Sequence, residues 1–250
     1  MKKLFAGCIA VSFAAMLAAC GDDDSDFASR PDGKESSSTT PSSKVIEPAE
    51  VTTGTMTDSR DDQTYNTVTI GTQTWMAENL NYETANSYCF NDYATYCTKY
   101  GRFYAWAAAM DSAGTWSTNG KGCGHGSKCS PTGTIRGICP EGWHLPSQTE
   151  WEVLFTAVGG ISTAGKMLKS ATGWNDSGNG TDAFAFTALP GGSRSMLGFY
   201  YIEGIYAYFW SSTEYDSEYA YYMHLKEVND NAILDYDNKY YGLSVRCLKD

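Results

Sequence analysis

One short loop of this chain combines cysteine with histidine, two side chains that commonly bind zinc. Cys123, His125 and Cys129 lie within it, but a zinc site needs about four ligands. An even number of cysteines in an exported chain instead predicts disulfides. The cysteines beyond the N-terminal region are Cys89, Cys97, Cys123, Cys129, Cys139 and Cys247.

Nearness along the chain suggests two short bridges, Cys89–Cys97 and Cys123–Cys129. That leaves Cys139 to pair with Cys247, although other connectivities stay open. The third bridge would close a loop of about a hundred residues and contribute roughly 4–5 kcal/mol in the chain-entropy model. The two short loops would contribute less.

Oxygen-bearing side chains fill a second loop, in which Asn175, Asp176, Asn179 and Asp182 carry amide and carboxylate oxygens. Calcium prefers such ligands, so calcium is the one cofactor we consider. Tight turns need the same residue types, and the spacing of an EF-hand is missing. A plain turn is therefore the alternative.

Tyrosines are too numerous for a single core, because the chain contains 18 of them. Alternation along a predicted strand puts Tyr206, Tyr208 and Trp210 on one face, and Tyr219 and Tyr221 alternate in the next strand. Tyrosine suits both stacking on sugar rings and contact with proteins, because it is rigid and amphipathic. These residues form the candidate ligand-binding face. Half-burial of the same rings under long loops is the alternative.

No nucleophile and general base can be paired for catalysis. The sequence contains no Ser-His-Asp order and no nucleophile elbow. Cys139 and His144 would make a couple, but a bridged cysteine has no thiolate. We therefore expect a binding protein rather than an enzyme.

A helix with sharply defined ends organises the folded part. Ser147 and Glu150 form a capping box, and Pro146 prevents extension backwards. An apolar stripe follows at helical spacing, and Gly159-Gly160 ends the helix. The stripe consists of Trp151, Leu154, Phe155 and Val158.

The remaining elements are mainly strands. A hairpin is predicted over 56–79, and an extended segment that passes into a short helix over 101–110. Residues 82–100 are predicted as a polar loop, 112–136 as a surface insertion and 163–170 as a helical turn or two. Further strands are predicted at 184–189, 199–202, 206–211, 219–225, 232–236 and 243–248. The fold class is α+β, with a mainly antiparallel twisted sheet, one or two helices and long disulfide-pinned loops.

The first 56 residues predict export and anchoring. Residues 1–19 form a signal peptide whose apolar run is too short for a membrane span, and the lipobox 17–20 predicts a lipid such as palmitate on Cys20. Residues 20–56 are low in apolar side chains and predict a disordered, acidic, Ser/Thr-rich tether. The acidic run 22–26 is either a solvated spacer or a surface-export tag. The folded domain is then 57–250.

The formal net charge of −11 argues against nucleic acid and against an anionic membrane surface as partners. Membrane attachment would come from the lipid alone. The expected location is the outer membrane, with the domain exposed at the cell surface.

Several segments carry a resemblance to a known family. They are 67–82 (TVTIGTQTWMAENLNY), 100–110 (YGRFYAWAAAM), 137–155 (GICPEGWHLPSQTEWEVLF), 184–192 (FAFTALPGG), 209–214 (FWSSTE) and 241–250 (YGLSVRCLKD). Together they resemble the Fibrobacter succinogenes major paralogous domain. That family is similar to the C-type-lectin-like fold of formylglycine-generating enzymes, which share a helix start like 145–152.

The resemblance implies a fold and a cell-surface setting rather than an activity. We expect a surface lipoprotein that binds polysaccharide of a plant cell wall or of the cell envelope. A protein–protein adhesion module without glycan affinity is the alternative. The third hypothesis is an enzyme like the formylglycine-generating enzymes. Those enzymes hold copper with a reactive cysteine pair, whereas the cysteines of this chain are predicted to form disulfides.

Overall fold

The computed structural model describes residues 51–250. The predicted signal peptide, Cys20 and most of the predicted tether lie outside the described residues. The tether boundary at residue 56 is wrong, because 52–57 form the strand β1. Its threonines are β-branched and pair in antiparallel register with the next strand, from Thr52 opposite Thr69 to Thr57 opposite Thr64.

The first sheet contains strands from both ends of the described chain. Its strands, in spatial order, are β1 (Thr52–Thr57), β2 (Thr64–Ile70), β3 (Gln73–Met76), β13 (Leu248–Lys249) and β6 (Trp143–His144). The predicted hairpin 56–79 is thus confirmed as β2 and β3, with β1 added at the edge. All of these pairs are antiparallel.

The second sheet has the order β11-β10-β9-β12-β5-β4, and β7 pairs with both β12 and β8. Its strands are β4 (Ser87–Tyr88), β5 (Phe103–Ala105), β7 (Ser193–Arg194), β8 (Tyr200–Tyr201), β9 (Tyr206–Glu214), β10 (Tyr219–Lys226), β11 (Ala232–Asn238) and β12 (Gly242–Ser244). Pairing is antiparallel except between β9 and β12. The predicted α+β class with mainly antiparallel strands is confirmed.

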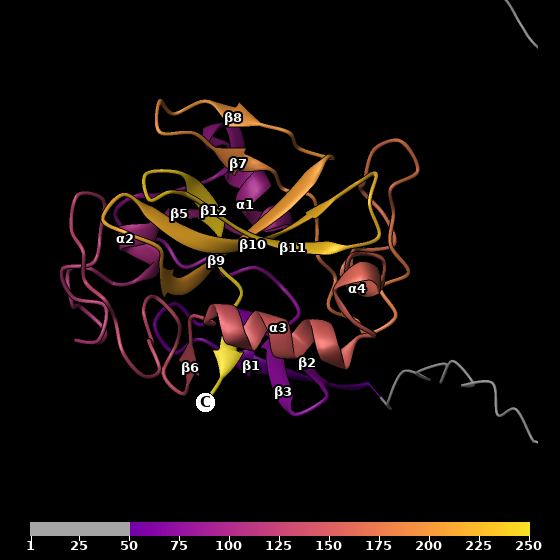
Figure 1. The fold of residues 1–250 in the computed structure, drawn as a ribbon, viewed down its shortest axis with the longest axis horizontal. Helices are drawn as coiled ribbons and strands as arrows, with labels where there is room; N and C mark the ends of the chain where they lie inside the picture. Colours follow the sequence, from indigo (N-terminus) through magenta and orange to yellow (C-terminus); the bar gives the residue numbers. More distant parts are fainter. Residues whose placement is uncertain (1–50) are drawn as a thin grey trace, which may run out of the picture. The chain divides into compact units, whose positions relative to one another are not determined.

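Within residues 51–250, four α-helices accompany the sheets: α1 (Ala94–Tyr100), α2 (Trp106–Ala109), α3 (Gln148–Ala157) and α4 (Ile161–Leu168). Figure 1 shows α3 between the long strands β9–β11 and the strands β2 and β3. Its apolar stripe packs on both sheets, because Trp151 contacts Trp75 of β3 and Phe209 of β9. No helix of the described residues is long and apolar enough to cross a membrane.

The helix α3 begins and ends as predicted. Ser147 Oγ accepts a hydrogen bond from Glu150 N, and the Glu150 carboxylate accepts one from Ser147 N. Glu150 also binds His144 of β6, whose other ring nitrogen lies 2.7 Å from Asp250 Oδ1. Burial lowers the pKa of His144, but the hydrogen bonds to Glu150 and Asp250 outweigh it, so the net pKa is raised.

Two predicted strands are wrong. Residues 184–189 form no strand, because Ala185 and Thr187 have positive φ values and the Asp182 carboxylate accepts hydrogen bonds from Thr187 N and Oγ1. The predicted strand 243–248 is divided into β12 and β13, which belong to different sheets. The division falls at 245–247, where Arg246 and Cys247 make separate tertiary contacts.

The disulfides confirm the predicted pairing: Cys89–Cys97, Cys123–Cys129 and Cys139–Cys247. The predicted loop 82–100 contains the helix α1 and β4, which the sequence analysis missed. The insertion 112–136 contains no helix or strand in the described structure, as predicted.

Candidate functional site

The crossing from β12 to β13 buries Arg246 between two other segments. Leu80 N donates to Val245 O and Met76 N donates to Cys247 O, so the crossing runs alongside 76–80. Arg246 is 1% exposed and forms no salt bridge with a carboxylate of the described residues. A buried guanidinium without a counter-ion needs an acceptor for every N–H group.

All the N–H groups of Arg246 find acceptors. Nε and Nη2 donate to Asn79 Oδ1 at 3.0 and 2.7 Å, and Nη2 also donates to Thr187 O. Nη1 donates to Met76 O and Phe186 O. Burial lowers the pKa of Arg246 to about 9, so the side chain stays charged at neutral pH. It therefore holds 76–79 and 186–187 in fixed positions.

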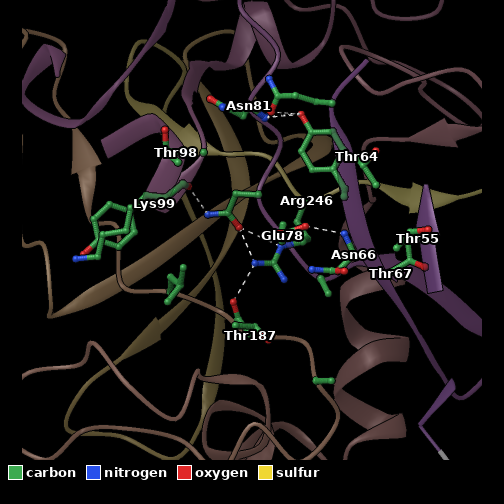
Figure 2. Close-up of a pocket in the computed structure, with 18 of the residues that line it drawn as sticks. Thr55, Thr64, Asn66, Thr67, Glu78, Asn81, Thr98, Lys99, Thr187 and Arg246 are labelled. Carbon is green, nitrogen blue, oxygen red and sulfur yellow. Dashed lines mark hydrogen bonds between the residues drawn. The ribbon is translucent and has the colours of Figure 1, made fainter. Parts of the chain in front are cut away.

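These segments form one wall of a cleft of about 700 Å³. The strands β1 and β2 line the cleft beside 77–79, where Ala77 N donates to Asn66 O, and the end of α1 lines it at 98–100 (Figure 2). This volume lies within the range of ligand-binding pockets, about 300–1,000 Å³.

The cleft is lined mainly by uncharged hydrogen-bonding side chains. Hydroxyl and amide groups come from Thr53, Thr55, Thr64, Thr67, Thr98, Thr187, Gln63, Asn66, Asn79, Asn81, Tyr65 and Tyr100. Burial raises the pKa of Tyr65 and of Tyr100, so both phenols stay protonated in the physiological range. Such a surface can donate to and accept from a polyhydroxylated ligand.

Several of these groups have no partner within the described part of the protein. Asn81 Nδ2 donates to Gln63 Oε1 at 3.2 Å, whereas Asn81 Oδ1 is unpaired. Glu78 Oε2 accepts a hydrogen bond from Asn66 N at 2.6 Å, as Figure 2 shows. The Asn66 amide and the Thr55 hydroxyl make no side-chain hydrogen bond there. The exposed side chains of Thr55 and Asn66 are therefore available to a ligand, whereas Asn81 Oδ1 is buried.

The structure divides the predicted aromatic face between two sides of the sheet. Tyr206 and Tyr208 lie on one side and are half-buried, with ring centroids 5.2 Å apart and nearly parallel planes. Trp210 continues this side but is fully buried, and its Nε1 donates to Tyr104 O. Trp210 is therefore unavailable to a ligand, and the prediction that it belongs to a binding face is wrong.

Tyr219 and Tyr221 lie on the opposite side of the sheet. Both pack edge-on against Tyr236 of the neighbouring strand β11. Tyr236 in turn stacks on Tyr215 at 4.0 Å. The single predicted face is not formed, because the strand register pairs Tyr222 with Trp210 and His224 with Tyr208. Alternation along β10 then puts Tyr219 and Tyr221 on the other side.

The oxygen-rich loop 175–182 uses its side chains in its own turns. Asn179 Oδ1 accepts a hydrogen bond from Trp174 N, and the carboxylate of Asp182 binds Thr187. Asn175 and Asp176 are exposed, and Asp176 has a positive φ. Calcium at this loop stays an expectation.

No group of three or more His, Cys, Asp or Glu side chains within 51–250 is arranged to hold a metal ion. In the loop 123–129, both cysteines are disulfide-bonded and His125 stacks on Tyr240 at 4.1 Å. The predicted disulfide is therefore present, and neither cysteine is a free thiolate that could bind a metal ion.

The sequence analysis missed the cleft because its walls are far apart in the chain. Arg246 lies 167 positions from Asn79. Two of the three carbonyl groups that it binds, those of Phe186 and Thr187, come from a segment that resembled a strand. One signal was present: Arg246 interrupts an apolar stretch, and a charged residue in such a place needs buried partners.

The chain was compared with protein-family models, with curated proteins and with solved structures. No curated protein and no solved structure matches the chain. The family model described as "Fibrobacter succinogenes major domain" matches residues 68–249, which is most of the described part. This chain belongs to the Fibrobacter succinogenes major domain family.

Proposed function

We propose that this domain binds carbohydrate and that the cleft lined by β1, β2, 77–79 and α1 is its binding site. One observation carries the proposal: a cavity of about 700 Å³ lined mostly by hydroxyl and amide side chains. Sugars present many hydroxyl groups that both donate and accept, so they match such a lining better than an apolar ligand would.

The tyrosines of β9 are the second place where a sugar could bind. Tyr206 and Tyr208 stack on each other, so each ring has at most one face left for a ligand. The stacked pair does not make the flat row of rings that a sugar chain would cover. This is why we favour the cleft, and why Tyr206→Ala belongs in the test as a comparison.

The setting of the proposed activity follows from the sequence. We propose that a lipid on Cys20 anchors the chain to the outer membrane and that a tether presents the domain at the cell surface. We also propose a C-type-lectin-like fold for the domain. Polysaccharide of a plant cell wall or of the cell envelope is then the ligand source within reach.

A protein partner is the second candidate, and one surface favours it. The connection between β7 and β8 exposes Met196 and Leu197, and Phe199 and Tyr201 follow it. Leu197 is 77% exposed and Phe199 is 58% exposed. A cluster of large exposed apolar side chains is typical of a protein-binding surface.

The test is retention of the purified protein on a panel of immobilised polysaccharides, with and without calcium. Thr55→Trp places a bulky ring at the cleft, and we expect it to abolish retention because Thr55 is exposed on β1 and lines the cavity. Thr52→Trp is the matched control on the same strand, since Thr52 is exposed but outside the cavity lining.

Loss with Thr55→Trp and retention with Thr52→Trp would support the cleft. Loss with Tyr206→Ala alone would move the site to the tyrosines of β9. Calcium-dependent retention would direct attention to Asn175–Asp182. If the unmodified protein bound none of the polysaccharides, a protein partner would become the better hypothesis.

A further inference from the structure

We infer that the cleft takes a neutral glycan and excludes acidic ones such as uronic-acid polymers. This inference rests on the proposed carbohydrate-binding function and names the ligand class for the same site. It follows from the charged side chains in the cleft lining, which are Glu78, Lys99 and Arg246.

An acidic sugar would need a positively charged donor with N–H groups to spare, because carboxylates are recognised by Arg or Lys through charge-assisted hydrogen bonds. Arg246 has none to offer. Its five N–H groups already donate to Asn79 Oδ1 and to the carbonyl oxygens of Met76, Phe186 and Thr187. Only 1% of the residue is exposed.

Lys99 is the other cation, and it is already engaged at the rim. Its Nζ lies 3.6 Å from Glu203 Oε1 and 4.4 Å from the centre of the Tyr100 ring. Glu203 also accepts a hydrogen bond from Tyr100 Oη at 2.8 Å. A ligand carboxylate would therefore meet the negative charge of Glu203 as well as the positive charge of Lys99. Repulsion by Glu203 would offset attraction by Lys99.

Glu78 adds a negative charge inside the cleft. One of its carboxylate oxygens accepts from Asn66 N, and no cation of the described residues pairs with it. It can accept a hydrogen bond from a sugar hydroxyl but repels a uronate. The net charge of −11 over the whole chain adds a long-range repulsion against polyanions.

The test compares neutral and acidic polymers in affinity gel electrophoresis at low salt. The neutral probes are glucomannan and mannan, and the acidic probes are polygalacturonate and alginate. We expect at least one neutral polymer to retard the protein and neither acidic polymer to do so. Retardation by polygalacturonate that weakens as salt is added would overturn the inference while leaving carbohydrate binding intact.

A variant provides a second readout. Glu78→Lys replaces the negative charge of the cleft with a positive one, so we expect polygalacturonate to retard this variant at low salt although it does not retard the unmodified protein. Failure of polygalacturonate to retard the folded variant would mean that charge in the cleft does not decide the selectivity and would contradict the inference. If no polymer of either class retarded the protein, the proposed function itself would fail, and the inference with it.

Discussion

At the scale of single residues, the domain buries three basic side chains, each 1% exposed: Lys169, Lys239 and Arg246. Backbone carbonyl oxygens hold all of them. Lys169 Nζ donates to the carbonyls of Lys226, Glu227 and Asn229, just as Arg246 donates to those around the cleft. In turns without regular backbone hydrogen bonds, the carbonyl groups are thus held by a cationic side chain from a distant part of the chain.

Lys239 is the one of these residues that also has a carboxylate partner. Its Nζ lies 2.6 Å from Glu214 Oε1, and both side chains are buried. Lys239→Met would leave the Glu214 carboxylate unpaired, so we expect unfolding to become easier by about 3–5 kcal/mol in chemical denaturation. Adding Glu214→Gln should recover part of the loss.

The matched control for Lys239 is Lys166→Met. Lys166 is half-exposed and lies 3.9 Å from an exposed carboxylate, so its loss should change the unfolding free energy by less than about 0.5 kcal/mol. Equal effects of the two variants would contradict the importance we give to the buried pair.

His144 makes stability depend on pH. Its pKa in the folded protein is raised above the usual 6.5, so its contribution is complete below that value and is lost as pH rises through the raised pKa. The pKa of Glu150 is net lowered: burial raises it, but the hydrogen bond from His144 and those from Ser147 outweigh burial. The Glu150 contribution is present above about pH 4.5 and is lost as pH falls through the lowered pKa.

Urea denaturation at several pH values measures this effect. The unfolding free energy should be greatest between about pH 4.5 and 6.5 and should fall as the pH rises through the raised pKa of His144. His144→Gln should flatten that fall. A fall of the same size in the variant would show that other groups cause it.

At the scale of elements, α3 links the two sheets, and its N-terminus is fixed by the capping box of Ser147 and Glu150. Ser147→Ala should destabilise the protein by about 1 kcal/mol, measured as a lower unfolding free energy, because an N-terminal acceptor is lost. The control is Thr149→Ala in the same turn, where the side chain is exposed. A smaller effect for Ser147→Ala than for the control would contradict the capping role.

Local patterns predicted the elements whose causes are local. The capping box and apolar stripe gave α3, and alternating apolar residues gave β2, β3, β9 and β10. The errors occurred where tertiary contacts override local preference. Residues 184–189 alternate like a strand, but Asp182 and Arg246 draw their backbone groups into turns. Arg246 lies 60 positions from Phe186, so no short window of sequence contains both.

The candidate site was predictable only in part for the same reason. The sequence indicated an aromatic surface, and Tyr206 and Tyr208 do lie side by side. It did not indicate that Trp210 would donate a hydrogen bond into the core, or that β1 would form a wall of the cleft. Those features depend on which strands become neighbours.

At the scale of the whole molecule, the Cys139–Cys247 disulfide joins segments 108 positions apart, next to the crossing that carries Arg246. Replacing both cysteines with alanine should lower the unfolding free energy by about 4–5 kcal/mol, because the bridge closes a long loop in the unfolded chain. The control is the double replacement of Cys89 and Cys97, which are 8 positions apart and should cost only about 2–3 kcal/mol. Equal losses would contradict the loop-length argument.

The cleft also depends on the whole molecule, since its walls come from the first sheet, α1 and the segment around Thr187. The most direct test is hydrogen–deuterium exchange of the protein with and without the neutral polysaccharide that retains it. We predict slower exchange in 53–55, 63–67 and 77–81, which line the cleft, and unchanged exchange in β9–β11. Slower exchange confined to β9–β11, with the cleft segments unchanged, would contradict a glycan site in the cleft.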